Sequence, residues 1–372
     1  MDLAIILKEH IEQYIEKYHS IYCDDKKKTV FDIINCRTSV MGGEVYFCKH
    51  CDTNHYVYHS CKNRHCPKCG KDDSAIWLEQ QLEKLLPVKY FLVTFTLPEE
   101  LRFICSVNKK LFYNALFYAS SESLKVLLSD PKYAGGISGF TGVLHTWTRK
   151  MLYHPHVHYI VPGGAYDKDN NIWNNVKSKF LVPVLALSKI FRAKFRDYIE
   201  ANNKEVFLLI DSKIWIKKNF VTHSKYVGKG DSALKYLSQY VYKTAISNTR
   251  ILSCENNKVK FSYINSESKK YEVITLDLVE FIRRFLDHVL PKRFKKVRHY
   301  GFNSPKAKEL FNSIKKILPS KEKKIKYEEK EINNFFTIDK TICPHCNNKM
   351  IWMGKIDRRA RSPSKYKKSI IS

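Results

Sequence analysis

The chain has 372 residues, more than a typical single domain, so we expect two or more folded units whose size is not limiting. Its 65 Lys and Arg residues outnumber 37 Asp and Glu residues, and the resulting net charge of +28 favours a polyanionic partner. No segment reaches the ~20 apolar residues of a membrane span, and the first residues lack a secretion signal. These features exclude a membrane protein and predict a soluble cytoplasmic one.

The first expected element is an amphipathic helix over residues 3–22, where apolar side chains recur near helical spacing. A Cys/His-rich block follows over residues 36–69. The chain contains 11 cysteines, and without an export signal they favour metal binding or thiolate chemistry over disulfides.

Two CxxC pairs occur in this block, and 14 residues separate them. Such spacing is typical of a zinc ribbon, in which four thiolates surround one tetrahedral zinc ion. We therefore expect one zinc ion to be bound by Cys48, Cys51, Cys66 and Cys69.

The block holds more potential ligands than one zinc ion can take, namely Cys36, Cys61, His65 and His59. A second zinc site built from this set is an alternative that the sequence leaves open. In either arrangement four protein ligands leave no open position for a substrate, so the metal would be structural. Basic residues in the block, among them Lys62 and Arg64, are expected to contact DNA.

Helical and strand-like patterns follow along the rest of the chain. The predicted helices cover residues 75–86, 111–128, 184–201, 232–244 and 276–290. The predicted strands cover residues 90–98, 140–148 and 156–162, with short strands within 251–275 and a short apolar run at 207–210.

A run of alternate histidines, His154, His156 and His158, lies at the start of one predicted strand. Residues i and i+2 of a strand project from the same face, so these imidazoles converge on one point, as metal ligands must. A hairpin turning near residues 150–151 would bring His145 about opposite His158 on that face. His145 is thus the expected third ligand, with His154 and Gln239 as alternatives.

Two tyrosines, Tyr236 and Tyr240, stand at positions i and i+4 of the predicted helix over 232–244. Helical geometry places them roughly 40° apart on one flank, so their hydroxyl groups can reach one spot. The alternative is that both rings merely widen a buried face. Tyr242 falls on the opposite flank.

The last residues, about 305–372, are rich in lysine and weakly periodic. They contain one further CxxC pair, Cys343 and Cys346, with no second pair after it. This pair could be a degraded metal site, or it could complete a site with His345 or with another chain.

Seven ordered segments resemble the HUH endonuclease superfamily, and specifically the two-tyrosine rolling-circle insertion-sequence transposases with an N-terminal zinc-binding region. They include CKNRHCPKC at 61–69, HPHVH at 154–158 and YLSQY at 236–240. The others lie at 95–102, 142–147, 245–250 and 288–302, and together they span about residues 30–303.

The resemblance implies an α+β fold with a central antiparallel sheet of the RRM-like or ferredoxin-like kind, preceded by a small zinc-binding domain. The expected units are a helix and zinc-binding domain at 1–85, a catalytic domain at 86–303 and a basic, partly disordered region at 304–372. Arg250 and Arg298, which lie in matching segments, are further expected DNA contacts.

The resemblance also implies that His156 and His158 are paired metal ligands and that Tyr236 and Tyr240 are nucleophiles. Each tyrosine would attack single-stranded DNA at an element end or target site, leaving a 5′-phosphotyrosine and a free 3′-hydroxyl. Imidazole ligands alone would favour zinc, copper, iron or nickel. Phosphate chemistry and the family favour Mg²⁺ or Mn²⁺ instead, and we expect one of these.

Two other functions remain open at this point. A plasmid relaxase or replication initiator would use the same chemistry, although the zinc block and the ordered segments favour a transposase. A non-catalytic, zinc-dependent DNA-binding regulator would explain the charge and the cysteines, but it gives no role to the histidine strand or to the tyrosine pair.

Overall fold

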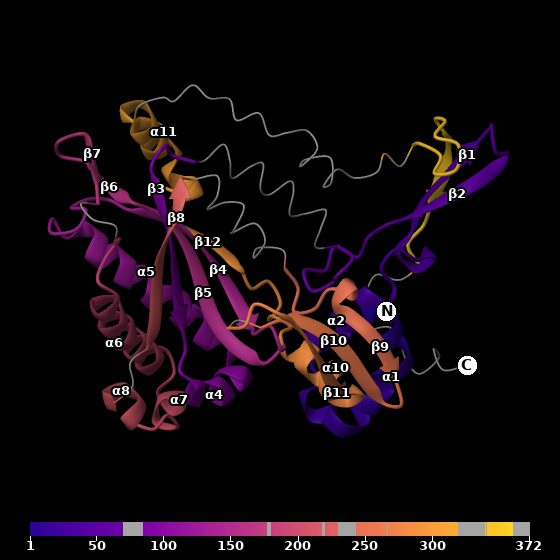
Figure 1. The fold of residues 1–372 in the computed structure, drawn as a ribbon, viewed down its shortest axis with the longest axis horizontal. Coiled ribbons are helices and arrows are strands. Elements are labelled where there is room, and N and C mark those ends of the chain that lie inside the picture. The colour runs from indigo at the N-terminus through magenta and orange to yellow at the C-terminus, as the bar shows by residue number, and fades with distance from the viewer. Residues whose placement is uncertain are drawn as a thin grey trace.

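The computed structural model describes residues 1–69, 85–176, 180–217, 220–229, 243–265, 267–318, 339 and 341–359. Figure 1 shows three parts: a large sheet with helices, a smaller helical and sheet unit, and a projecting arm of strands. Among the described residues, no helix combines the length and apolar character needed to cross a membrane.

The central sheet has five antiparallel strands in the order β12-β4-β5-β3-β8. Their bounds are β3 (Lys89–Thr96), β4 (Gly139–Trp147), β5 (Tyr153–Pro162), β8 (Val221–Lys229) and β12 (Val297–Gly301). Helix α5 (Lys109–Ser129) connects β3 to β4, and α6 (Val184–Asn202) lies between β5 and β8. This β-α-β-β-α-β order is the ferredoxin-like arrangement, to which β12 adds an edge strand. The expected α+β fold with a central antiparallel sheet is confirmed.

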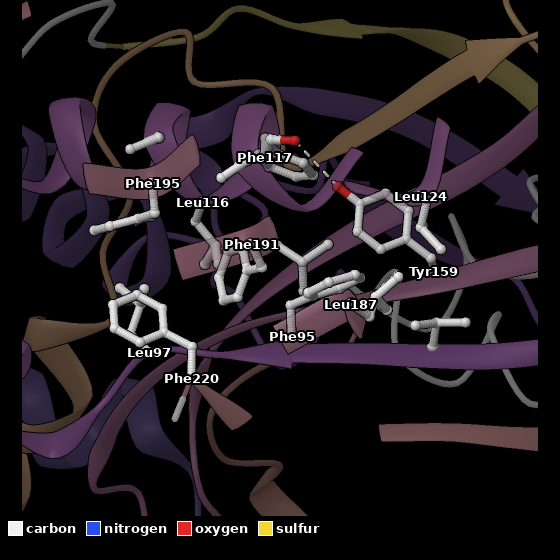
Figure 2. Packing of buried hydrophobic residues seen from close by; sticks show 14 of the residues in the cluster. Phe95, Leu97, Leu116, Phe117, Leu124, Tyr159, Leu187, Phe191, Phe195 and Phe220 are labelled. Atoms are coloured by element: carbon white, nitrogen blue, oxygen red, sulfur yellow. Dashed lines mark hydrogen bonds between the residues drawn. The ribbon is translucent and has the colours of Figure 1, made fainter. Parts of the chain in front are cut away.

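One face of this sheet packs against α5 and α6 (Figure 1). Strand residues that alternate along β3 and β5, such as Phe95 and Tyr159, point into this core together with Phe191 of α6 (Figure 2). The Tyr159 hydroxyl shares a 2.7 Å hydrogen bond with Ser120 Oγ and donates to the Phe117 carbonyl oxygen. Because side chains alternate along a strand, the neighbouring residues of β5 must project from the opposite face.

A second core joins segments that are far apart in the sequence. The elements are α1 (Leu3–Tyr18), α2 (Asp24–Ile34), β9 (Ile251–Glu255), β10 (Lys258–Ile264), β11 (Tyr271–Asp277) and α10 (Leu278–Asp287). Asp2 caps α1 by accepting from the Ala4 N–H, and Asn248 donates to the Asp2 carboxylate at 3.0 Å. Asp277 caps α10 in the same way. The N-terminal helices therefore share a core with strands from the second half of the chain.

The projecting arm is a three-stranded sheet in the order β13-β1-β2. Strands β1 (Gly43–Cys48) and β2 (Thr53–Tyr58) form a hairpin, and β13 (Ile351–Ile356) pairs antiparallel with β1. Part of the lysine-rich C-terminal region thus folds back onto the cysteine block (Figure 1).

Several short elements were not expected from the sequence. They are α4 (Arg102–Val107), β6 (Gly164–Asp167), β7 (Ile172–Asn175), α7 (Lys204–Leu208), α8 (Lys213–Lys217) and α11 (Lys308–Ile317). The strands β1, β2, β8, β12 and β13 and the helix α2 were also missed. Two further predicted helices, over 75–86 and 232–244, lie mostly outside the described residues.

Candidate metal centres

Three histidines meet on the sheet face that α5 and α6 leave open. The ring centroids of His145, His156 and His158 lie 4.8 to 5.5 Å apart, and one ring nitrogen of each lies within 4.8 Å of the others. His145 is 3% exposed, whereas His158 is half-buried, so the cluster can be reached from solvent.

The register of β4 and β5 differs from the expected one. His145 lies directly opposite His156, and Val143 lies opposite His158. The expectation that His145 faces His158 was therefore wrong by two residues, because a hairpin centred between residues 150 and 151 pairs residue 145 with residue 156. A shift of two residues preserves the face of every side chain, so His145 still joins the cluster.

Hydrogen bonds orient two of these rings. His156 Nδ1 donates to the carbonyl oxygen of His154 at 2.6 Å, which leaves Nε2 as its ligating nitrogen. His158 Nδ1 lies 2.9 Å from Thr94 Oγ1 on the neighbouring strand β3. Burial lowers the pKa of His158 to about 4, with a further contribution from the positive charge of Lys243, and burial also lowers the pKa of His156. Both rings are therefore neutral near pH 7, which is the form that binds metal.

The competing ligand His154 has another partner. Its Nδ1 accepts a 2.9 Å hydrogen bond from Arg102 Nη2, and it is not part of the three-histidine cluster. The other sequence-predicted residues of this centre, Tyr236, Tyr240 and Gln239, lie outside the described residues.

Sequence reasoning missed a cation next to Trp147, the residue that stacks on His145. The Trp147 indole stacks on the His145 ring, and Lys296 Nζ lies 5.3 Å from the Trp147 ring centroid. Lys296 also donates to the Lys243 carbonyl oxygen at 3.4 Å, and burial lowers its pKa to about 7. Lys296 is one lysine among many in a basic chain, so only the pairing of β12 with β4 reveals its position.

A first group of four cysteines, the N-terminal cluster, consists of Cys36, Cys61, Cys66 and Cys69. The Sγ atoms of Cys36 and Cys61 lie 3.5 and 3.6 Å from that of Cys69. Tetrahedral zinc with Zn–S bonds of about 2.3 Å places its sulfur ligands about 3.8 Å apart, so the arrangement fits zinc. Hydrogen bonding from the Cys61 thiol lowers the pKa of Cys36 to about 7, which favours the thiolate that zinc requires.

A second group, the bridging cluster, consists of Cys48, Cys51, Cys343 and Cys346. Cys48 Sγ lies 3.5 Å from Cys346 Sγ, and Cys51 Sγ lies 3.9 Å from Cys343 Sγ. The expected single site built from Cys48, Cys51, Cys66 and Cys69 is therefore wrong. The β1–β2 hairpin carries its CxxC pair away from the other one, and β13 supplies the partners from the C-terminal region.

The structure also places the predicted histidine ligands of the cysteine block elsewhere. His65 Nε2 accepts a 3.2 Å hydrogen bond from the Leu290 N–H, and His65 is in neither cysteine cluster. Burial holds the pKa of His65 well below its usual value. His59 lines a cleft beside Cys61. The alternative site predicted from the sequence combined Cys36 and Cys61 with His65 and His59. In the structure, Cys66 and Cys69 take the places of these two histidines.

Three of the four expected DNA-binding residues make contacts within the chain. Arg64 Nη1 donates to the Phe294 carbonyl oxygen. Arg250 donates to the carbonyl oxygens of Ser262 and Arg149 at 2.7 and 2.6 Å.

Arg298 lies on the core side of β12. Its guanidinium lies 4.2 Å from the Phe117 ring centroid, and Nη2 donates to Asn114 Oδ1 on α5. Lys62 differs from these arginines because it is exposed and lines a cleft of about 630 Å³ with Lys355 and Arg358.

Two family models match the chain. The model described as "Putative transposase" matches residues 139–309, and the model described as "Transposase zinc-binding domain" matches residues 6–97. The first range contains the three-histidine cluster, and the second contains the N-terminal cluster. Neither range reaches Cys343 and Cys346.

Two curated proteins resemble the chain over most of their length. "Putative transposase y4qJ" of Sinorhizobium fredii (strain NBRC 101917 / NGR234) is 34% identical over 326 residues, which are 83% of this chain and 81% of the relative. "Transposase for insertion sequence element IS801" of Pseudomonas savastanoi pv. phaseolicola is 25% identical over 360 residues, covering 90% and 84%. No solved structure matches the chain.

Proposed function

The chain belongs to the insertion-sequence transposase family with an N-terminal zinc-binding domain, and we propose that it cuts and joins single-stranded DNA through a tyrosine-linked intermediate. DNA is the substrate of such a protein, and its zinc-binding domain gives zinc a structural role. The observation that carries the proposal is the three-histidine cluster on the sheet face opposite α5 and α6, in which burial keeps His156 and His158 neutral near pH 7.

His145, His156 and His158 would hold a divalent cation, and oxygen atoms of DNA and water would complete its ligand shell. We propose Mg²⁺ or Mn²⁺. When bound, the cation would polarise the scissile phosphate and stabilise the leaving oxygen. The hydrogen bond from His156 to the His154 carbonyl fixes the direction of the ligating nitrogen before metal arrives.

Tyr236 and Tyr240 would supply the nucleophiles. The tyrosine oxygen attacks phosphorus, the bond from phosphorus to the 3′-oxygen breaks, and that oxygen takes up a proton to become a 3′-hydroxyl. The product is a 5′-phosphotyrosine. A free 3′-hydroxyl can later attack this linkage and release the tyrosine, so strands are joined without ATP. With two tyrosines, one can cleave while the other still carries its strand.

Lys62 is the expected DNA contact with the best support. It is exposed in a cleft that also presents Lys355 and Arg358, so a phosphate group could bind among three cations. The in-chain hydrogen bonds of Arg64 and Arg250 favour structural roles for those two residues.

The experiment is a denaturing gel that detects covalent protein–DNA adducts. The purified full chain is incubated with a labelled single-stranded oligonucleotide spanning an end of its DNA element, with Mn²⁺ or with EDTA. We expect an adduct with Mn²⁺ that is absent from the double variant Tyr236→Phe, Tyr240→Phe. The matched control is Tyr242→Phe, which should form the adduct normally. An undiminished adduct in the double variant would exclude these nucleophiles, and an adduct only with duplex DNA would exclude the single-stranded substrate.

A further inference from the structure

The two turns that carry the bridging cluster have the same backbone design. In each turn, the residue after the second cysteine adopts a left-handed conformation, with φ of 50° at Asp52 and 58° at Asn347. Each turn also closes a hairpin, because β1 pairs with β2 and Ile342 forms a bridge with Lys349. Two CxxC hairpins that face each other are the arrangement of a zinc ribbon.

Polar groups around the bridging cluster are directed at its sulfur atoms. His55 Nε2 lies 3.5 Å from Cys343 Sγ, and Asn348 Nδ2 donates to Cys346 Sγ at 3.6 Å. Donors of this kind stabilise thiolates and orient metal ligands. All four cysteines are free, and sulfur separations of 3.5 and 3.9 Å are far longer than the ~2.05 Å of a disulfide.

The arm has too little apolar core to explain its fold. Its buried cluster contains only Tyr46, Cys48, Cys343 and Met350 among the described residues, and two of these are thiols. Large apolar side chains of the same strands remain exposed, including Trp352 at 53%. Sheets with so small a core need a metal or a covalent cross-link to be stable.

We propose that the bridging cluster binds a second structural zinc ion, which joins the N-terminal zinc-binding domain to the C-terminal end of the same chain. Cys51 and Cys343 are 292 positions apart in a chain of 372 residues, so one ion would close a loop that contains most of the polypeptide. This metal would hold β13 against β1, and β13 in turn carries Lys355 toward the cleft that contains Lys62. The proposal does not depend on the tyrosine chemistry.

The test is the zinc content of the purified full chain, measured by inductively coupled plasma mass spectrometry. We expect two zinc ions per wild-type chain and one in the variant Cys343→Ser, Cys346→Ser. The variant Cys61→Ser, Cys66→Ser, which removes ligands of the N-terminal cluster, should also keep one. The matched control is Cys23→Ser, Cys254→Ser, because these two cysteines lie outside both clusters and should leave two zinc ions bound.

Hydrogen exchange provides a second readout that separates local loss of metal from general unfolding. In Cys343→Ser, Cys346→Ser we expect β1 and β13 to lose amide protection, while β3 and β5 keep it. One zinc ion in the wild-type chain, or two in this variant, would overturn the proposal. If the metal ion that this variant loses were iron rather than zinc, the choice of metal would be overturned. Zinc counts do not report on DNA cleavage, so failure here is distinguishable from failure of the proposed function.

Discussion

The indole of Trp147 stacks on the imidazole of His145, with ring centroids 5.0 Å apart and planes inclined by 16°. Both residues belong to β4, on either side of a bulge that interrupts its pairing with β5. Residues i and i+2 of a strand project from the same face, so the two rings lie next to each other, and the stack limits rotation of the His145 ring.

Replacing Trp147 should therefore weaken metal binding without removing a ligand. We expect Trp147→Ala to raise the Kd for Mn²⁺ roughly tenfold, because an unrestrained His145 ring must be ordered when metal binds. Trp147→Phe, which keeps a stacking ring, should change the Kd much less. Isothermal titration calorimetry measures both, and equal affinities for the wild type and the alanine variant would contradict a positioning role.

Thr94 should have a comparable effect on the opposite side of the cluster. Its hydroxyl lies 2.9 Å from His158 Nδ1, and an oxygen that accepts from Nδ1–H leaves Nε2 free to ligate. Thr94→Val removes the hydroxyl at nearly constant shape, and we expect about tenfold weaker Mn²⁺ binding. Thr94→Ser should retain wild-type affinity. If the serine variant lost as much affinity as the valine variant, packing rather than the hydrogen bond would be responsible.

Lys296 should destabilise the fold near neutral pH while it supports DNA binding. Its pKa of about 7 in the folded protein lies below the ~10.4 of an unfolded lysine, so the unfolded chain binds more protons between these values. The loss of stability caused by burying the charged Lys296 side chain is therefore complete below pH 7, and it disappears as the pH rises toward 10. We expect Lys296→Met to increase the free energy of unfolding by about 2 kcal/mol at pH 7 and by much less at pH 10.

The same variant should bind single-stranded DNA more weakly, because the cation next to Trp147 is lost. Urea unfolding at the two pH values gives the stability difference, and fluorescence anisotropy gives the DNA affinity. Lys296→Arg is the control that keeps the charge. A methionine variant with unchanged stability at pH 7 would show that Lys296 is well solvated, and unchanged DNA affinity would remove its functional role.

Arg250 should contribute to stability rather than to DNA contact. Its guanidinium donates to the carbonyl oxygens of Ser262 and Arg149 and thereby joins the β4–β5 turn to β10. Arg250→Met leaves these carbonyl groups without their charged donor, and we expect it to lower the free energy of unfolding by roughly 2–3 kcal/mol. DNA affinity of the folded variant should stay near the wild-type value. Thermal unfolding and anisotropy distinguish this outcome from weaker DNA binding at normal stability.

The sequence predicted the features that depend on local periodicity. Alternation along β5 placed His156 and His158 on one face. The two-residue error in the register between β4 and β5 does not change which face these side chains occupy. The same alternation places Val157 and Tyr159 in the core behind them. Helices α5, α6 and α10 were also predicted close to their observed bounds, because each combines good length with an apolar stripe.

Features that depend on contacts between distant segments were not predictable. Nothing near Cys48 indicates that its partner is Cys346 rather than Cys69, because CxxC pairs are interchangeable in sequence. Lys296 is likewise indistinguishable from its neighbours until β12 pairs with β4. Arg298 was expected to contact DNA, but the strand alternation that directs it toward Phe117 belongs to a strand that the sequence did not reveal.

The central claim is that the three-histidine cluster holds the cation required for DNA cleavage, and covalent adduct yield in Mn²⁺ tests it most directly. We expect His156→Ala and His158→Ala each to reduce the yield from single-stranded DNA at least a hundredfold, while His154→Ala, a histidine of the same strand outside the cluster, stays within a few fold of the wild type. Undiminished adduct in His156→Ala and His158→Ala, with both variants folded, would contradict the claim.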